Sequence, residues 1–299
     1  MFKHILIPLD GSILSEASLI PAAVLAEKFK APVTLLHVIE QDAPSEVHAD
    51  RHLTEPAEAL DYLKDIAQRA FPSKVKVKTH VHTAPVSDVA RSIVEHATTE
   101  FQPDLIVTCT HGKGGMRDVL FGSIAQQIVT QGETPLLLIK PTSPRFKLEK
   151  ILIPLDPDSV HDNSFPFAES LAHAFQAKLH LLSVIPTFGT LAGEQAAAGN
   201  LMPVTAQAFL DMREENALQH LQEHMTALHE KGLSASIEIA RGDPAAAIAK
   251  IAEKATMDLI ILATHRRKGM GAFWARSVAP KVAQKTTIPL LLIPLVQTE

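Results

Sequence analysis

A glycine-rich stretch between two apolar segments carries the residues of this chain that are best suited to chemistry. The apolar run from Leu105 to Val107 predicts a buried strand, and the polar sequence after it contains Gly112 and ends at Gly122-Ser123, where an amphipathic segment begins. Glycine allows the backbone to approach a ligand closely, and a helix N-terminus presents unpaired N–H groups to an anion. The loop is therefore a candidate phosphate site, although an ordinary strand-to-helix connection has the same pattern.

Two aspartates occupy a second position of interest. Asp10 and Asp156 end the first predicted strand of each half of the chain, at the carboxyl edge where open α/β sheets bind ligands. Their structural alternative is to cap the helix that follows. Ser123 has no identifiable base, so we expect it to cap a helix and donate to phosphate, and Cys109 is expected to be a small packed side chain. The sequence predicts no catalytic residue.

The chain has 15 histidines, which raises the question of a metal site. His80 and His82 alternate along a predicted strand and share one face, and His48 and His52 lie four residues apart. Neither pair is accompanied by Cys–His or His-Glu-x-x-His spacing, so no metal site is predicted.

Composition limits the class of protein. The 299 residues suffice for roughly two domains, and a hydrophobic content of 46% can fill packed cores. A net charge of −5 and 5% aromatic residues argue against a nucleic-acid-binding surface. The one cysteine is compatible with a reducing compartment, and the first apolar run is too short for a secretory signal or a membrane span. A cytoplasmic protein is expected.

The chain is a tandem repeat. The segment from Ile5 to Asp10 recurs identically from Ile151 to Asp156, at an offset of 151 − 5 = 146. Three later matches share an offset of 154: Asp104 to Ile106 with Asp258 to Ile260, Thr110-His111 with Thr264-His265, and Pro135 to Ile139 with Pro289 to Ile293. We predict domains at residues 1–141 and 147–299, joined by a short linker in which two prolines favour an extended spacer.

The apolar pattern of each half predicts strands that alternate with helices. This order is typical of an α/β fold with a doubly wound, parallel, five-stranded Rossmann-like sheet. In the first half the strands are expected at 3–9, 33–39, 75–83, 105–109 and 136–140, and the helices at 16–29, 55–71, 86–97 and 123–130. In the second half the strands are expected at 151–155, 179–185, 235–240, 259–263 and 290–293, and the helices at 164–175, 205–231, 245–255 and 277–285. The Gly- and Ala-rich residues 188–200 predict a lid-like loop or a short irregular helix.

Together these features resemble a tandem universal stress protein. The resemblance covers both halves and rests on the opening Ile-Leu-Ile-Pro-Leu-Asp strand, on Leu36-His37-Val38, on the Thr-His-Gly loop with Gly122-Ser123, and on the closing Pro-Leu-Leu-Leu-Ile strand. It implies two domains of the adenine nucleotide alpha hydrolase-like fold.

The resemblance also implies a ligand, ATP or a related adenine nucleotide. Members that bind ATP carry a glycine, two residues, a second glycine, nine residues, and then glycine with serine or threonine. Here the first position is Cys109, a departure that places a –CH2–SH side chain where the family has none. The residues implied to bind the nucleotide are Asp10, Val38, Gly112, Gly122 and Ser123. A glycine before the third helix is kept as Gly242 in the second half, whereas the first half is expected to have Thr83 there.

The second half departs further from the family pattern. Its three glycine positions hold Ala263, Arg266 and Arg276, the last followed by Ser277. The nucleotide loop is therefore degenerate. The basic cluster of Arg266, Arg267, Lys268 and Arg276 is either a solvated face or a site for another anionic ligand, in a pocket that Leu201, Met202, Val204 and Phe209 would line.

Three functions follow as hypotheses. The first is a cytoplasmic stress-response protein without a catalytic cycle, in which the first half binds an adenine nucleotide. The second is an interaction module that binds no nucleotide, and the third, disfavoured because a Walker lysine motif is missing, is a slow ATP hydrolase. Two apolar strands, at 136–139 and 290–293, would be sheet edges prone to association if they were exposed. The resemblance implies that they pair antiparallel, either within the chain or between two copies.

Overall fold

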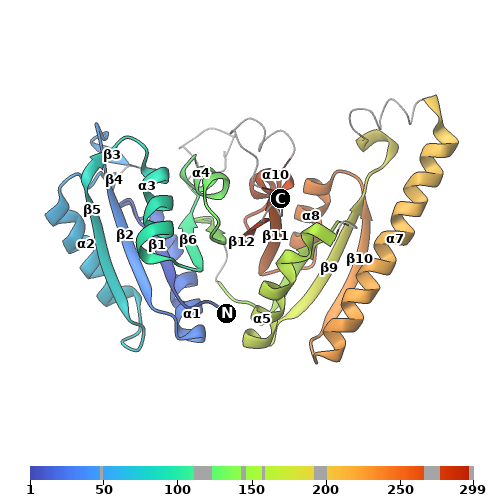
Figure 1. The fold of residues 1–299 in the computed structure, drawn as a ribbon, viewed down its shortest axis with the longest axis horizontal. Coiled ribbons are helices and arrows are strands. Elements are labelled where there is room, and N and C mark those ends of the chain that lie inside the picture. The colour runs from blue at the N-terminus through green and yellow to red at the C-terminus, as the bar shows by residue number, and fades with distance from the viewer. Residues whose placement is uncertain are drawn as a thin grey trace. The chain divides into compact units, whose positions relative to one another are not determined.

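The chain folds into two compact units in the computed structural model (Figure 1), which describes residues 1–47, 50–110, 123–142, 146–156, 159–191, 201–265 and 277–295. Unit 1 comprises Met1–Phe146, Thr264–Arg276 and Pro289–Glu299. Unit 2 comprises Lys147–Ala263 and Ser277–Ile288. Unit 1 is therefore discontinuous in sequence, because its last segment comes from the end of the chain.

The sheet of unit 1 has the strand order β12-β7-β6-β1-β2-β5. Five of its strands run parallel to their neighbours along the first repeat: β1 (Ile5–Pro8), β2 (Val33–Glu40), β5 (Val77–Val86), β6 (Leu105–Cys109) and β7 (Leu136–Ile139). β6 and β7 are buried along their whole length. Continuous apolar strands of this kind are expected where helices cover both faces of a parallel sheet. A separate two-stranded ribbon joins β3 (Glu46–Val47) to β4 (Asp50–Arg51).

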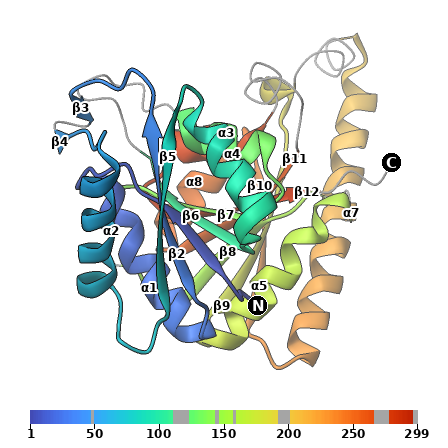
Figure 2. The ribbon, with the colours of Figure 1, turned by 60° about the vertical axis from the view of Figure 1, so that its left-hand side comes forward.

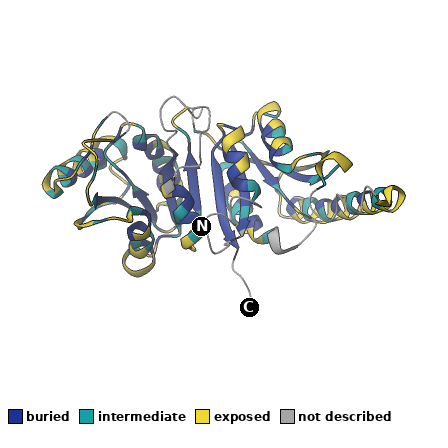
Figure 3. Cartoon of the chain, turned by 90° about the horizontal axis from the view of Figure 1, so that it is seen from above, coloured by how far each residue is buried: buried dark blue, intermediate teal, exposed yellow. Residues whose placement is uncertain are grey.

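The helices of unit 1 cover two faces of its sheet (Figure 2). α1 (Leu19–Phe29) packs beside α2 (Pro56–Ala70), and α3 (Val89–His96) packs beside α4 (Ser123–Gln131). The predicted first helix begins as a 3-10 turn, η1 (Ser15–Ser18), and α3 continues into a π-helical turn, η2 (Ala97–Phe101). Figure 3 shows the burial that results, with buried central strands and with exposed residues on the helices and connections. The edge strand β5 also carries exposed residues.

Unit 2 repeats this plan. Its parallel strands follow the order β10-β9-β8-β11, with β8 (Lys150–Pro154), β9 (Lys178–Ile185), β10 (Ala235–Arg241) and β11 (Leu259–His265). Its helical elements are η3 (Ser159–Ser164), α5 (Phe165–Phe175), η4 (Phe188–Thr190), α7 (Pro203–Glu230), α8 (Pro244–Lys254) and α10 (Val278–Lys285). The predicted α/β class with parallel sheets is confirmed.

The predicted pairing of the two terminal strands is also confirmed. β12 (Leu290–Leu295) lies antiparallel to β7 at the edge of the unit 1 sheet, with Leu290 opposite Leu138 and Leu292 opposite Leu136. All residues of β12 are buried. The strand thus covers an apolar edge that would otherwise be open to association.

The third strand and the third helix differ from the sequence prediction. β5 extends to Val86, three residues beyond the predicted end, and α3 begins at Val89 after the N-cap Asp88. In the second repeat Asp243 is the matching N-cap and Gly242 precedes it. The residue of the first repeat that corresponds to Gly242 is therefore Ser87, and the prediction of Thr83 was wrong.

Among the described residues, no helix combines the length and the hydropathy needed to cross a lipid bilayer. Most of the predicted lid segment, residues 192–200, lies outside the described residues. Its first residues form the short 3-10 turn η4.

Candidate functional site

The strand order of unit 1 defines one position at which a ligand is expected. β1 lies between β6 and β2, so the chain leaves β1 toward one side of the sheet and later returns on the other. Open α/β sheets bind ligands outside the carboxyl ends of the strands at such a switch point. β1 ends at Pro8 and β6 ends at Cys109, so Leu9 and Thr110 are the first residues after the two strands that flank the switch point. Asp10 follows Leu9 directly. The structure therefore places Asp10 at the edge that the sequence predicted.

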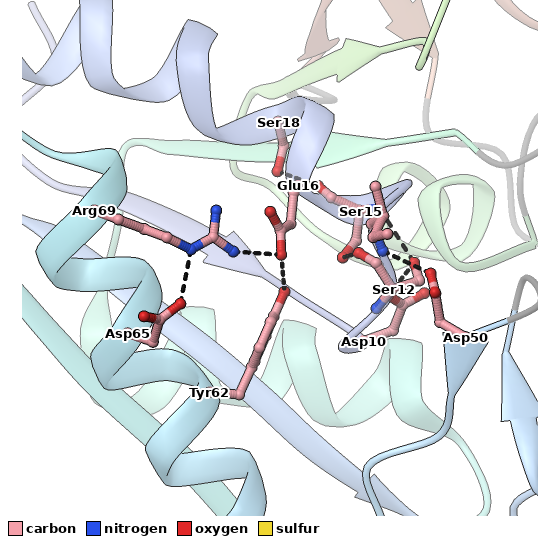
Figure 4. Close-up of polar contacts among 10 residues, drawn as sticks. Asp10, Ser12, Ser15, Glu16, Ser18, Asp50, Tyr62, Asp65 and Arg69 are labelled. Carbon is pink, nitrogen blue, oxygen red and sulfur yellow. Dashed lines mark hydrogen bonds and ion pairs between the residues drawn. The ribbon is translucent and has the colours of Figure 1, made fainter.

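Asp10 is held in a tight turn (Figure 4). Its Oδ1 atom accepts hydrogen bonds from the backbone N–H of Ser12 at 2.9 Å and from the Ser12 hydroxyl at 2.7 Å. Gly11 between them has φ +89°, a conformation that L side chains rarely adopt. The Ser12 hydroxyl oxygen in turn accepts from the N–H of Ser15, the first residue of η1, at 3.2 Å. Asp10 therefore closes a local turn and does not cap the helix, since η1 has Leu14 as its N-cap and no side-chain cap; the turn fixes the direction of the carboxylate.

His37 also holds this turn in place. Its side chain is buried, and its two ring nitrogens lie 2.8 Å from the carbonyl oxygen of Leu9 and 3.0 Å from that of Leu53. A single imidazole therefore joins the end of β1 to the segment that leads into α2. In the sequence, His37 stands out only as part of the Leu36-His37-Val38 segment. Both of its ring nitrogens are directed at backbone carbonyl oxygens, which indicates a structural role.

Val38 lies near the end of β2 on the adjacent strand and is buried. It pairs with His82 of β5, and the register then shifts before the next pair, Glu40 with Val86. Such irregularities interrupt the ladder and are over-represented next to binding sites. The structure therefore brings Asp10 and Val38 to neighbouring strand ends, because β1 and β2 pair in parallel.

Cys109 closes β6 and is 6% exposed. Burial raises the pKa of its thiol to about 12, and the negative charge of Asp10 adds to the effect. The side chain is therefore a neutral thiol packed in the sheet, as the sequence predicted. The next residue, Thr110, is also buried and donates its backbone N–H to the carbonyl oxygen of Ile139 at 2.7 Å.

Three predicted binding residues belong to the connection after β6. Gly112 and Gly122 lie outside the described residues. Ser123 is the first residue of α4, which agrees with its predicted place at a helix start. The helix N-terminus, with its unpaired N–H groups, therefore begins at the end of the glycine-containing segment.

Two further groups near this edge were not selected from the sequence. Lys140 follows directly after β7, and burial lowers the pKa of its ammonium group. Tyr62 of α2 has its pKa raised by burial first and then by the charge of Glu16, with a smaller contribution from Asp10. Neither residue belongs to a recognisable motif, so only the folded arrangement reveals them.

The corresponding edge of unit 2 is less informative. Asp156 follows β8 at the position of Asp10 and is exposed. Arg266, Arg267, Lys268 and Arg276 lie outside the described residues. The apolar residues predicted to line a pocket are exposed instead, since Leu201 and Val204 have more than four fifths of their surface accessible. Val204 borders a shallow hollow of about 490 Å³, which is lined by Phe188, Pro203, Val204, Gln207, Ala208 and Asp211.

Comparison with known proteins gives a consistent family result. The model of the Universal stress protein family matches residues 1–140 and again residues 147–294. A universal stress protein of Methanocaldococcus jannaschii is 30% identical over 149 residues, which cover 47% of this chain and 83% of the relative. A universal stress protein of Mycolicibacterium smegmatis is 22% identical over 309 residues, covering 97% of this chain and 96% of the relative.

Solved structures agree at the level of the fold. A universal stress protein from Archaeoglobus fulgidus superposes with a TM-score of 0.72 at 15% identity, covering 99% of this chain and 97% of that one. A functionally unknown protein from Pseudomonas aeruginosa superposes with a TM-score of 0.69 at 18% identity, covering 98% and 93%. Both similarities extend over the two repeats.

Proposed function

Because this chain belongs to the universal stress protein family, with one family domain in each repeat, we propose that its first repeat binds an adenine nucleotide such as ATP. In this proposal residues 1–141 form the nucleotide-binding domain and residues 147–299 form a degenerate one. The chain acts as a cytoplasmic stress-response protein without a catalytic cycle. Fractionation of cells that produce the protein tests the location.

The observation that carries the proposal is the placement of Asp10. Its carboxylate stands at the switch point of the sheet, in a turn fixed by Ser12 and Gly11. A carboxylate at the end of a strand is the group that α/β nucleotide-binding proteins use to accept hydrogen bonds from ribose hydroxyls. The start of α4 at Ser123 supplies N–H donors of the kind that bind phosphate.

The chemistry of these groups fits an adenine nucleotide. Asp10 provides an acceptor, Val38 an apolar neighbour on the adjacent strand, and the segment from Gly112 to Gly122-Ser123 a backbone that can approach phosphates. The thiol at Cys109 remains uncharged at neutral pH because burial raises its pKa to about 12. It therefore adds no electrostatic repulsion toward phosphate. Only the volume of its side chain opposes binding of the nucleotide.

Calorimetric titration of the full chain with ATP tests the proposal. We expect one nucleotide per chain, with binding lost in Gly122→Arg, because an arginine side chain would occupy the space next to the helix start. Arg276→Ala should bind as the unchanged protein does. Cys109→Gly should bind more tightly, because it restores the family's first glycine.

A matched pair of aspartate variants sharpens the test. Asp10→Asn keeps the shape of the side chain and should weaken binding, whereas Asp156→Asn, at the same position of the second repeat, should leave the affinity unchanged. Two equivalent sites per chain would contradict the proposal. No binding of ATP, ADP, AMP or cyclic AMP would leave the interaction module as the better description.

A further inference from the structure

Three side chains of unit 2 converge on one point. Asp162 of η3 faces two histidines of α7, with 3.3 Å between Asp162 Oδ1 and His220 Nε2 and 3.3 Å between Asp162 Oδ2 and His224 Nε2. The candidate ligand atoms of all three residues lie within 4.8 Å of one another. Their side chains are 28%, 18% and 24% exposed, respectively. The cluster is therefore largely shielded while remaining open to a small solute.

The local structure fixes this convergence. His220 and His224 are four residues apart on one helix, a spacing that places two side chains on the same face. The ring of His224 stacks on Phe165 of α5, with 4.0 Å between centroids and 15° between planes. The ring of His220 meets that of His224 edge-on at 4.5 Å. Both imidazoles are thus oriented by packing before any ligand arrives.

In the first repeat, the carboxylate at the corresponding position forms an ordinary ion pair between the turn and a helix. The offset that relates Ile5 to Ile151 also relates Glu16 to Asp162, since 162 − 16 = 146. Glu16 accepts a hydrogen bond from Arg69 of α2 at 2.7 Å and one from Tyr62 at 3.4 Å (Figure 4). A guanidinium ion is a permanent cation without a lone pair, so this arrangement is an ion pair and cannot ligate a metal.

The second repeat keeps the carboxylate but replaces the permanent cation with two imidazoles. A neutral imidazole is a weak partner for a carboxylate, and it has a lone pair for a metal ion. Two nitrogen donors and one carboxylate suit first-row divalent ions such as Zn²⁺, whereas Mg²⁺ and Ca²⁺ prefer oxygen ligands. Ligands bound about 2.1 Å from such an ion lie roughly 3.0–3.4 Å apart, which matches the two separations between the carboxylate and the imidazoles.

We propose that Asp162, His220 and His224 form a site for a divalent transition-metal ion of the Zn²⁺ class. The ion joins the turn that follows β8 to the middle of α7. Three protein ligands leave at least one coordination position for water or for a ligand from solution. The proposal is independent of the nucleotide site, because its residues lie in unit 2.

A second histidine cluster in unit 1 is the internal competitor. His80 and His96 approach Glu100, each at 3.7 Å, and Glu100 is 49% exposed. These separations are longer than those around Asp162, and the carboxylate is more open to water. We therefore assign the metal to the cluster of unit 2 and use the cluster of unit 1 as a control.

The test is a calorimetric titration of the tag-free, chelator-treated full chain with Zn²⁺. We expect one tightly bound ion per chain and a rise in melting temperature, because an ion that binds only the folded state stabilises it. Asp162→Asn and His220→Gln should each weaken binding roughly 100-fold or more, since even residues that merely orient a ligand are worth about 10–100-fold. Circular dichroism establishes that the variants remain folded.

Two control variants and a spectroscopic readout keep the test specific. His173→Ala, at an exposed histidine of α5, and His96→Gln, in the competing cluster, should bind Zn²⁺ as the unchanged protein does. Electron paramagnetic resonance of the Cu²⁺-loaded protein should show two nitrogen ligands, and His220→Gln should reduce them to one. Absence of binding, binding that survives Asp162→Asn, or binding lost in His96→Gln would each overturn the proposal.

Discussion

Gly11 shows how one residue without a side chain positions the candidate binding group. Its φ of +89° turns the backbone so that Ser12 can donate twice to Asp10. A β-carbon at this position would lie 2.7 Å from the Cδ1 atom of Leu53. The turn is therefore restricted both by backbone conformation and by the segment packed over it.

Replacing Gly11 with alanine should destabilise the protein. We expect a loss of about 1–3 kcal/mol in the free energy of unfolding from the strained backbone, with an added steric cost from Leu53. Urea denaturation of Gly11→Ala measures the sum. Gly232→Ala is the matched control, because Gly232 also has a positive φ but no heavy atom within 4 Å of the added β-carbon.

The double variant Gly11→Ala/Leu53→Ala separates the two effects. It should lose less stability than the sum of its single variants, because the shortened side chain at position 53 relieves the clash. Equal losses in Gly11→Ala and Gly232→Ala would show that Leu53 exerts no steric restriction.

The thiol of Cys109 should be unreactive in the folded protein. Its pKa is raised to about 12, chiefly by burial, so at pH 8 only about one thiol in ten thousand is ionised, compared with roughly a quarter at the ordinary pKa of about 8.5. The thiolate is the nucleophile in such reactions. A disulfide reagent such as Ellman's reagent at pH 8 should therefore detect no thiol until the protein is unfolded.

Unfolding in guanidinium chloride should then release one reactive thiol per chain. Asp10→Asn should change little, because burial and not the aspartate is the larger cause of the raised pKa. Rapid stoichiometric labelling under native conditions would show that the end of β6 opens to solvent.

At the scale of elements, the third helix of each repeat starts in the same way. The side chain of Asp88 accepts a hydrogen bond from the backbone N–H of Arg91 at 2.9 Å, and Asp243 accepts one from Ala246 at 2.9 Å. Each bond satisfies an N–H group that the helix leaves unpaired. The two repeats thus preserve a helix start although their loops have diverged.

Removing either cap should lower stability. We expect Asp88→Ala and Asp243→Ala each to reduce the free energy of unfolding by about 0.5–2 kcal/mol, measured by denaturation followed by circular dichroism. Asp88→Asn and Asp243→Asn keep an acceptor oxygen and should lose only a fraction of this amount. Asparagine variants as unstable as the alanine variants would argue that charge, and not the hydrogen bond, stabilises these helices.

The elements that the sequence predicted well are those with strong apolar patterns. The repeated segment from Ile5 to Asp10 and the Leu-rich strands correspond to buried central strands, since burial on both faces demands apolar residues. The boundary at Val86 was misplaced because β5 is an edge strand with a partly exposed face. The predicted start of the next helix, residue 86, lies inside that strand.

The candidate sites differ in how visible they are in sequence. Asp10 could be located because a strand end defines the sheet edge. The hydrogen bonds of Ser12 and the buried bridge of His37 could not, because they depend on turn geometry and on Leu53. Asp162 and His220 are separated by 58 residues along the chain. The four-residue spacing of His220 and His224 was a usable signal, but the carboxylate opposite them became visible only in the fold.

At the scale of the whole molecule, the sequence repeat and the compact unit do not coincide. Unit 1 includes Pro289–Glu299, so its sheet is completed by a strand from the second repeat. The first repeat alone ends its sheet at β7, a strand of four buried apolar residues. The compact unit therefore extends beyond the repeat that sequence identity defines.

A fragment of residues 1–141 should consequently associate with itself. It lacks β12, and the exposed edge of β7 offers unpaired backbone groups beside an apolar surface. Size-exclusion chromatography with light scattering should give dimers or larger species. Adding residues 286–299 as a synthetic peptide should compete with this association, because the peptide supplies the missing strand. A stable monomeric fragment that ignores the peptide would contradict this prediction.

The late arrival of β12 also has a consequence for the order of events during protein synthesis. β7 ends at Ile139 and β12 begins at Leu290. At a typical translation rate of about 5–20 residues per second, the ribosome needs roughly 8–30 s to make the intervening chain. During that interval the nascent first repeat carries an unpaired apolar strand edge. Chaperone binding during translation should therefore peak after β7 has emerged and end when β12 leaves the ribosomal tunnel.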